Sequence, residues 1–327
     1  MINKTGVCTL FEGHYHFGVA TLSNSLYQNG YRGNIYVGYR GDLPPWVINA
    51  EKIDLEPFGE ITTFKPSLHR DIILFFIPLN TKYSLTNYKP DFMLDLLNGP
   101  AQDIESIFYF DPDIVVNKSW DKFEDWVNCG VAVCEDVNSP IPEFHPRRVG
   151  WRSYYKDYDF KLQFKSNMYV NGGFIGVKRS DFSFLNIWKD IQECMGEAIG
   201  GLENSIFANL QYKSTIPERK GFQIFDKSDQ DALNVSIEVF NGDVSIIGSE
   251  SMGFKEGYSL MSHALGSPKP WKAKLLSRAL NGITPRATDV AYWQLKNFPF
   301  KAHSNMTFKR KIISIYIAKL INRFYKK

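Results

Sequence analysis

Short apolar runs alternate with helical patterns along the first hundred residues. The runs 7–10 and 34–37 have the length and apolar character of buried strands. Between them, the segment 15–29 carries apolar residues at helical spacing and stops at Asn29-Gly30, a common helix ending. This strand, helix, strand order predicts a parallel sheet that is covered by helices.

The same alternation continues further along the chain. We expect, in order, a helix over 91–97, a buried strand over 106–110, a strand over 174–177 and a helix over 182–195. Another helix begins at Ser228, and 269–280 also has a helical pattern. Together these elements predict an α/β fold whose sheet is covered by helices.

The segment 135–167 breaks this alternation. It is rich in Pro, Arg, aromatic and charged residues and shows no clear period. Long irregular segments inside compact proteins are usually lids or binding loops. We therefore expect an insertion here that serves as a lid or a binding loop. Trp151, Tyr154 and Tyr155 are its candidate stacking surfaces, with a role in the core as the alternative.

The last 20 residues, 308–327, have the pattern of an amphipathic helix. At 100° per residue one face of about 140° is apolar, and it holds Ile313, Tyr316, Ile317, Leu320, Ile321 and Phe324. The opposite side carries Lys311, Lys319, Arg323 and Lys326, together with Ile312 and Ile315. Such a helix either lies in an anionic membrane interface or packs on the body with a solvated basic face.

Charge is distributed unevenly along the chain. Its 327 residues include 38 Lys+Arg and 35 Asp+Glu, a net charge of +3. The stretch 290–327 holds nine Lys or Arg and no Asp or Glu, which leaves 29 basic and 35 acidic residues in the rest. A body at −6 excludes a general nucleic-acid binder, and a tail at +9 indicates an anionic surface as its partner.

Composition narrows the class of protein. With 44% hydrophobic and 22% charged residues, the chain is neither a disordered polymer nor a collagen-like fibre. Its four cysteines form no CxxC pair, so we expect reduced, structural thiols. No apolar run reaches the ~18 residues of a membrane span or the pattern of a signal peptide. We therefore expect a cytoplasmic protein that is at most peripheral to a membrane.

The strongest chemical motif is Asp111-Pro112-Asp113, which follows the apolar strand 106–110 directly. In open α/β sheets, ligands bind at the carboxyl ends of strands. Two carboxylates at such a point are suited to Mg²⁺ or Mn²⁺ bridging a diphosphate. The alternative is an ordinary Asp-Pro-Asp turn, but the apolar strands on both sides argue against a surface turn.

Three further segments carry polar groups with plausible roles. Asn171-Gly172-Gly173 allows close approach of the backbone to a ligand, or forms a hairpin-type turn. Asp229-Gln230-Asp231 opens a helix, either as a reactive cluster or as its N-terminal cap. His263 is a possible third metal ligand, and Lys269 lies six residues later, where it could pair with a phosphate.

Taken in order, these four segments resemble the retaining glycosyltransferases of family 8, which have the GT-A fold and include glycogenin and bacterial lipooligosaccharide galactosyltransferases. The resemblance covers about residues 5 to 280. Its carriers are YFDPDIVV, the NGGF segment, DQDALN and HALGSPKPW, with FEGHYHFGVATLSNSL similar to the family's first nucleotide-binding loop and helix.

The resemblance implies a donor site for a UDP-sugar with a bound Mn²⁺ or Mg²⁺. Asp111, Asp113 and His263 would be the metal ligands, and Gly266 and Lys269 would contact the diphosphate. The other implied contacts are Thr9, Glu12 and Tyr15 for the nucleoside, Asn171, Gly172 and Lys89 for the sugar or phosphate, and Asp229 and Gln230 near the anomeric carbon. Asp231 completes the only polar cluster available as nucleophile or stabiliser.

The sequence departs from the family at two of these positions. The nucleoside loop has Glu12 where an Asp is usual, so the selection of the base is less secure. The usual Asn-Ala/Ser-Gly is Asn171-Gly172-Gly173 here, which removes a side chain from the middle position.

These expectations combine into one predicted function. Residues 1–285 would form a GT-A catalytic domain, an α/β fold with a mixed central sheet and helices on both faces, in which 135–167 is an irregular insertion on the acceptor side. Residues 286–327 would form a basic, aromatic tail that associates with the inner face of the cytoplasmic membrane. The enzyme would move a hexose, with retention, from a UDP-sugar to a glycan or glycolipid acceptor in lipopolysaccharide, O-antigen or capsule assembly. The alternatives are a sugar nucleotidyltransferase, which would need a basic Gly-rich loop that FEGHYHFG lacks, and a non-catalytic carbohydrate-binding protein.

Overall fold

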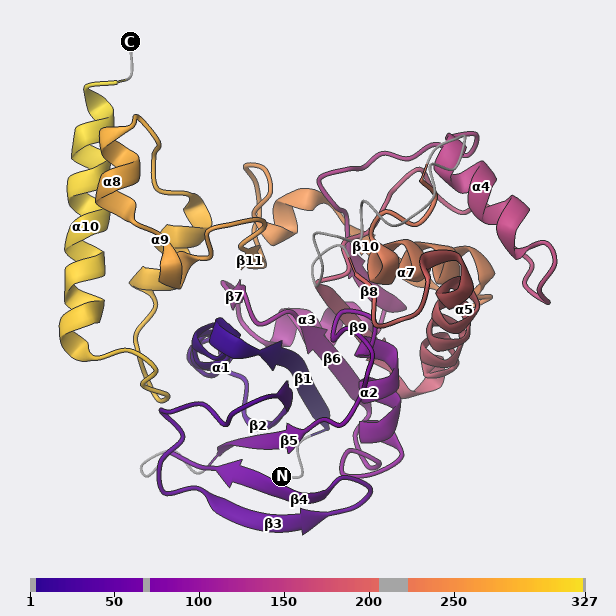
Figure 1. Ribbon diagram of the computed structural model, residues 1–327, viewed down its shortest axis with the longest axis horizontal. Helices are drawn as coiled ribbons and strands as arrows, with labels where there is room; N and C mark the ends of the chain where they lie inside the picture. The colour runs from indigo at the N-terminus through magenta and orange to yellow at the C-terminus, as the bar shows by residue number, and fades with distance from the viewer. Residues whose placement is uncertain (1–3, 67–70, 206–222, 326–327) are drawn as a thin grey trace.

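A nine-stranded mixed sheet forms the centre of the molecule (Figure 1). The structure is a computed structural model and describes residues 4–66, 71–205 and 223–325. From one edge to the other the strands are β10 (Val244–Ile247), β8 (Val131–Cys134), β9 (Phe174–Lys178), β6 (Ser106–Phe110), β1 (Thr5–Glu12), β2 (Gly33–Arg40), β5 (Ile72–Pro78), β4 (Gly59–Phe64) and β3 (Glu51–Leu55).

Strand β1 lies near the middle of the sheet and is parallel to its neighbours β2 and β6. Strand β9 pairs antiparallel with β6 and β8, and β4 pairs antiparallel with β3 and β5. The sheet is therefore mixed, and its parallel centre is the part that the alternation of strands and helices predicted.

Helices cover both faces of this sheet, so the predicted fold class is confirmed. Side chains of β1 alternate between two hydrophobic clusters, as the two-residue period of a strand requires. Val7 and Phe11 pack with α1 (His16–Gln28) and α3 (Asp121–Val127). The other face packs against α2 (Lys89–Leu97), α4 (Pro146–Tyr155), α5 (Ser183–Ile199) and α7 (Ser228–Val239).

The segment 135–167 is not irregular throughout, because it contains α4. His145 caps this helix by accepting a hydrogen bond from the Arg147 backbone N–H. The side chains of Trp151 and Tyr155 are fully buried, and their polar atoms donate to backbone carbonyls of other segments. These two aromatic residues belong to the core, so their interpretation as stacking surfaces was wrong. Tyr154 is half-buried beside them.

The C-terminal part gathers three helices around a hydrophobic cluster of their own. These are α8 (Leu275–Leu280), α9 (Ala287–Gln294) and α10 (Asn305–Arg323), with Trp293 and Ile315 at the centre of the cluster. The helix expected over 269–280 begins only at Leu275. Pro270 starts a short 3-10 turn, and Ala273 is extended before the helix.

Helix α10 packs on the body through the side opposite its apolar face. Ile315, Ala318 and Asn322 are buried. The apolar face stays open to solvent, and we call its exposed residues the apolar stripe: Ile313, Tyr316, Ile317, Leu320 and Phe324. The predicted helix extended to 327, but Lys326 and Lys327 lie outside the described residues.

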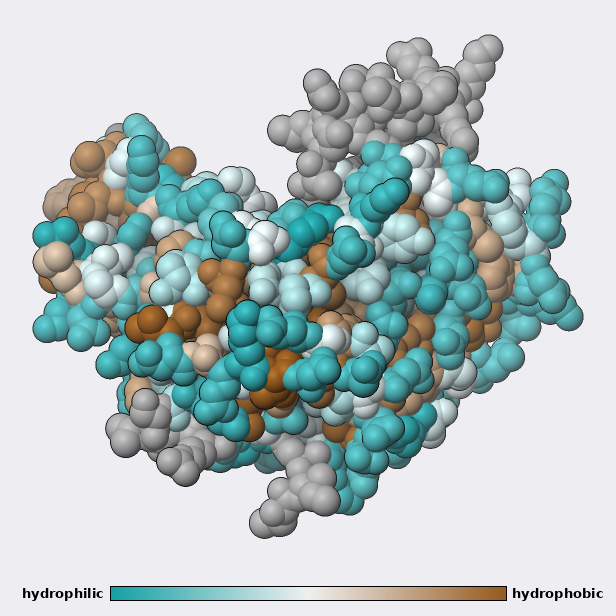
Figure 2. All heavy atoms as spheres, turned by 60° about the horizontal axis from the view of Figure 1, so that its bottom comes forward, coloured by the Kyte–Doolittle hydropathy of each residue, from teal (hydrophilic) through white to brown (hydrophobic). Residues whose placement is uncertain are grey.

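Hydrophobic side chains gather on the end of the molecule that the C-terminal helices form (Figure 2). Within the described part of the chain, no helix is both long enough and apolar enough to cross a bilayer.

Candidate active site

The Asp111-Pro112-Asp113 turn lies at the carboxyl end of β6 and is anchored on both sides. All five residues of β6 are buried, and the turn leads directly into β7 (Ile114–Val116), which is also buried. The Asp111 N–H donates to the Gly173 carbonyl at 2.7 Å. A Cβ on Gly18 of α1 would lie 2.2 Å from the Pro112 carbonyl oxygen, so this glycine lets the helix pack directly on the turn.

Strand pairing brings His263 to the same point. β11 (Met261–His263) pairs antiparallel with β7, with His263 opposite Ile114. The His263 Nε2 atom lies 3.3 Å from Asp113 Oδ1 and 3.7 Å from Asp111 Oδ2. One ligand atom from each of the three side chains lies within 4.8 Å of the other two.

This trio fits a divalent cation. The two carboxylates suit either Mn²⁺ or Mg²⁺, and the imidazole nitrogen favours Mn²⁺, because Mg²⁺ prefers oxygen ligands. The His263 Nδ1 atom is buried and has no hydrogen-bond partner among the described residues. A Cβ on Gly173 would lie 2.5 Å from the imidazole, so glycine is needed there for the ring to lie where it does.

Lys269 balances the negative charge of the turn. Its ammonium group forms an ion pair with Asp113 and donates to the Ala264 carbonyl at 2.7 Å. Burial by itself would raise the pKa of Asp113, but attraction from His263 and Lys269 outweighs it and lowers that pKa well below the usual range. Asp113 is therefore a carboxylate at neutral pH.

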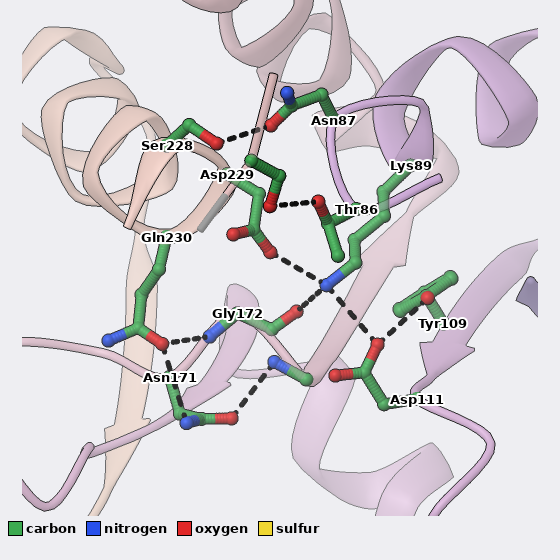
Figure 3. Close-up of polar contacts among 12 residues, drawn as sticks. Thr86, Asn87, Lys89, Tyr109, Asp111, Asn171, Gly172, Ser228, Asp229 and Gln230 are labelled. Atoms are coloured by element: carbon green, nitrogen blue, oxygen red, sulfur yellow. Dashed lines mark hydrogen bonds and ion pairs between the residues drawn. The ribbon is translucent and has the colours of Figure 1, made fainter. Parts of the chain in front are cut away.

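Lys89 joins three parts of the chain beside the metal ligands. Its ammonium lies 2.8 Å from Asp229 Oδ2, 2.8 Å from the Gly172 carbonyl and 3.2 Å from Asp111 Oδ1 (Figure 3). Burial alone would lower the pKa of Lys89, but attraction from Asp111 and Asp229 raises it above the ordinary value. A permanently charged lysine thus fixes both carboxylates in place.

The first turn of α7 carries two side chains into the same region (Figure 3). Gln230 Oε1 accepts from the Gly172 backbone N–H at 3.1 Å. Asp229 Oδ1 and Gln230 Nε2 are buried, and neither has a partner in the part of the chain that the structure describes. No side-chain cap is formed at Lys227, the residue before α7. Asp229 therefore serves the pocket rather than the helix end.

Asp231 points away from this region. Its Oδ1 accepts from the Tyr169 hydroxyl at 2.7 Å and lies 3.4 Å from Arg147, and its Oδ2 accepts from the Lys227 backbone N–H at 2.8 Å. Burial, partly offset by Arg147 and the Tyr169 hydroxyl, raises the pKa of Asp231 to about 7. Asp231 therefore links the start of α7 to Arg147 of α4.

A cavity of about 340 Å³ contains most of the site predicted from the sequence. The predicted residues that line it are Glu12, Tyr15, Lys89, Asp111, Asp113, Asn171, Gly172, Asp229, Gln230, His263, Gly266 and Lys269. Thr9 and Asp231 do not line it. Thr9 is buried in β1, where its hydroxyl has no partner within the described ranges.

Glu12 is already paired at the edge of this cavity. Its carboxylate lies 2.8 Å from Arg40, whose guanidinium also donates to the Tyr83 carbonyl. The carboxylate that the resemblance assigns to the nucleoside is therefore held by a cation of β2.

The cavity also has lining residues that we did not predict, among them Tyr109, Asp136 and Lys227. Asp136 accepts from the Asn171 side-chain amide at 2.6 Å and lies 3.6 Å from the Lys227 ammonium. The sequence could have predicted Asp136, because it lies two residues after the buried strand β8, much as Asp111 follows β6. Lys227 carries no signal beyond its place before α7.

Comparisons with known proteins agree with this fold. No family model and no curated protein matches the sequence. Among solved structures, the bifunctional glycosyltransferase WbbM matches 95% of this chain at 13% identity, with a TM-score of 0.52. This chain spans about half of WbbM (52%).

Two other solved structures match over most of the chain. The galactosyltransferase LgtC, in complex with donor and acceptor sugar analogues, matches 94% of this chain and 99% of its own at 15% identity, with a TM-score of 0.46. GlyE from Streptococcus pneumoniae matches 98% of this chain and 64% of its own at 14% identity, with a TM-score of 0.47. The match to WbbM, the one of these three with a TM-score above 0.5, confirms the resemblance to glycosyltransferases at the level of the fold.

Proposed function

We propose that the protein is a metal-dependent retaining glycosyltransferase that moves a hexose from a UDP-sugar to a glycan acceptor. One observation carries the proposal: the Asp111, Asp113 and His263 trio shares a cavity with the buried side chains of Lys89, Asp229 and Gln230. The first set suits a metal and a diphosphate, and the second suits a reacting sugar.

In this proposal the two ends of the cavity do different work. When bound at the trio, Mn²⁺ or Mg²⁺ would act as a Lewis acid that offsets the charge of the diphosphate. Lys269 would stabilise the negative charge that develops on the leaving phosphate, since its ammonium lies beside Asp113 at the cavity wall. Gly266 has a positive φ of 69° and open space beside its Cα, which leaves room for phosphate oxygens.

Asp229 and Gln230 would face the anomeric carbon as it becomes oxocarbenium-like. The unpartnered Asp229 Oδ1 offers negative charge there, while Lys89 holds its Oδ2. Because an amide is a poor nucleophile and Asp229 is tied to a lysine, we favour attack by the acceptor on the face that the nucleotide leaves. The leaving phosphate would then take the acceptor proton. A stable covalent sugar on Asp229 of the wild-type protein would refute this mechanism.

Asp231 has a positioning role in this proposal. Its hydrogen bonds to Tyr169 and to the Lys227 backbone fix the turn from which Asp229 and Gln230 project.

The test of the proposed function is a panel of nucleotide sugars with and without Mn²⁺. We expect metal-dependent hydrolysis of one UDP-sugar, with the α-anomer as product in an early NMR spectrum. If no nucleotide sugar binds and none is turned over, the proposal fails.

We further propose that the acceptor is lipid-linked and that α10 holds the enzyme on an anionic membrane surface. The apolar stripe supports this, because it is exposed although the helix is packed on the body. Basic side chains flank it on both sides, Arg310 on one and Lys319 and Arg323 on the other. Deletion of 304–327 should abolish sedimentation with anionic vesicles, and unchanged sedimentation would leave α10 a packing role only.

A further inference from the structure

A second hollow lies between α8 and α10, which run side by side (Figure 1). It is a groove of about 340 Å³ that shares no lining residue with the cavity of the candidate active site. Its lining residues are Lys274, Leu275, Leu276, Ser277, Thr307, Arg310, Lys311 and Ser314.

The charge of this groove has one sign. Three of its lining residues are basic and none is acidic. Lys274 and Arg310 are exposed, and neither forms an ion pair with another described residue. By contrast, Arg278 and Arg286 in the same C-terminal part both form ion pairs with the buried Asp289. The groove is therefore a place where positive charge is left for a partner.

Lys311 forms the floor of the groove. Its ammonium donates to the Ala273 carbonyl at 2.7 Å and lies 5.5 Å from the centre of the Trp293 ring. Burial lowers the pKa of Lys311 from its ordinary value. An anion in the groove would favour the charged form and would meet an ammonium that is already held in place.

Hydroxyl groups complete the donor set. Ser277, Thr307 and Ser314 line the groove. The Thr307 hydroxyl accepts from Ser304, which leaves its own hydrogen to donate, whereas Ser314 donates its hydrogen to the Arg310 carbonyl at 2.8 Å and can only accept from a ligand. Lysine, arginine and hydroxyl donors around one hollow are the chemistry that recognises phosphate oxygens.

The apolar surface next to the groove distinguishes between two kinds of phosphate. Leu276 lines the groove and is 37% exposed. Ile317 and Ile313, at the edge of the apolar stripe, are seven and three residues after Arg310 and lie on its side of α10. A small soluble anion would contact the basic residues only and would leave this apolar surface exposed to water. An amphiphile would contact the basic residues and the apolar surface.

We propose that the groove binds the phosphate of an anionic lipid headgroup, with the acyl chains against Leu276 and the apolar stripe. The inference rests on the proposed membrane association and deepens it. On a diffuse basic surface every basic residue would contribute about equally to binding an anionic bilayer. At a specific site, most of the binding free energy would come from a few residues. The groove would also fix how the enzyme is oriented on the bilayer.

The test compares two double variants that each remove two positive charges. K274A/R310A changes the groove, and K309A/K319A changes two exposed lysines of α10 that do not line it. Binding is measured by sedimentation with phosphatidylcholine vesicles containing 20% phosphatidic acid, without donor or acceptor sugar. Diffuse attraction is worth about fivefold per basic residue, so the control pair should lose about 25-fold. We expect the groove pair to lose at least tenfold more than the control pair.

Equal losses in the two pairs would overturn the groove as a site. Loss of inorganic phosphate binding in K274A/R310A, with equal losses of vesicle binding, would identify a free anion as the ligand and would also refute the lipid. Failure of the wild-type protein to bind vesicles would instead refute membrane association. Donor hydrolysis in solution should be unchanged in both variants, and their melting temperatures show whether each one is folded.

Discussion

The cavity of the candidate active site and the C-terminal groove both contain lysines, but the surroundings of these lysines differ. In the cavity Lys89 is buried between two carboxylates and a carbonyl, and Lys269 is paired with Asp113. In the groove Lys274 and Arg310 are exposed, and among the described residues no acidic side chain lines the groove with them. A buried charge needs a fixed partner, whereas an exposed charge keeps its hydration until a ligand replaces it. The charged side chains of the cavity are therefore held in place by one another, whereas those of the groove would gain their partner only when a ligand binds.

The largest expected effect comes from removing a metal ligand. Asp113→Asn should lower metal-dependent donor hydrolysis by about 10³-fold or more, because a neutral amide is a weak ligand and leaves Lys269 without its partner. Isothermal titration with Mn²⁺ should show the same loss. The exposed Asp54→Asn is the control and should behave as wild type. Full activity of Asp113→Asn would show that the trio is not the metal site.

Breaking the buried ion pair should be the next largest effect. Lys89→Met leaves Asp111 and Asp229 close together without a cation, and we expect a loss of about 3–5 kcal/mol in the free energy of unfolding. The matched control is Lys52→Met, which removes an exposed pair with Glu60 and should leave stability nearly unchanged, because water screens exposed ion pairs. Urea denaturation measures both. Similar costs at the two sites would contradict the contrast between fixed and exposed charges.

The pH dependence of stability should report on Asp231. Its pKa is about 7 in the folded protein against an ordinary value of 3.8, so between these pH values the folded state keeps a proton that the unfolded state has lost. The free energy of unfolding should therefore fall as pH rises from about 4 to 7, by at most about 4 kcal/mol. Asp231→Asn should remove this slope and Asp226→Asn should keep it. An unchanged slope in Asp231→Asn would contradict the assignment.

The smallest effect is expected on the exposed side of α10. Leu320→Glu should weaken vesicle binding about tenfold, since an exposed leucine contributes about 1.5–3 kcal/mol when it is buried in a lipid interface. Stability should change by no more than about 0.5 kcal/mol. The contrasting variant Ile315→Ala should cost about 2–5 kcal/mol of stability and leave vesicle binding of the folded protein intact. The reverse pattern would mean that the stripe serves packing.

Local patterns predicted the parts of the fold that local forces determine. The apolar strand before Asp111 and the Asn29-Gly30 helix ending were readable because burial and turn chemistry act over a few residues. The orientation of Asp231 was also within reach. Two positions along a helix turn a side chain by about 200°, so Asp229 and Asp231 cannot face the same cavity.

Other features depended on distant partners. Which side of α10 packs could not be read from its helical wheel, because the surface that receives Ile315 is made by α8 and α9. The insertion around α4 was obscured because its aromatic residues are buried by α5 and by the segment around Ile224, neither of which is near in sequence.

The pairing of β11 with β7 has a consequence for the newly made protein. Asp111 and Asp113 are synthesised about 150 residues before His263, and only the β11–β7 ladder brings the histidine to them. A chain that has been translated only as far as α7, or cleaved after it, carries two of the three ligands. In the proposed function, metal affinity would then be low in unfinished or clipped chains, and donor turnover would begin only after the segment that carries β11 has folded onto the rest.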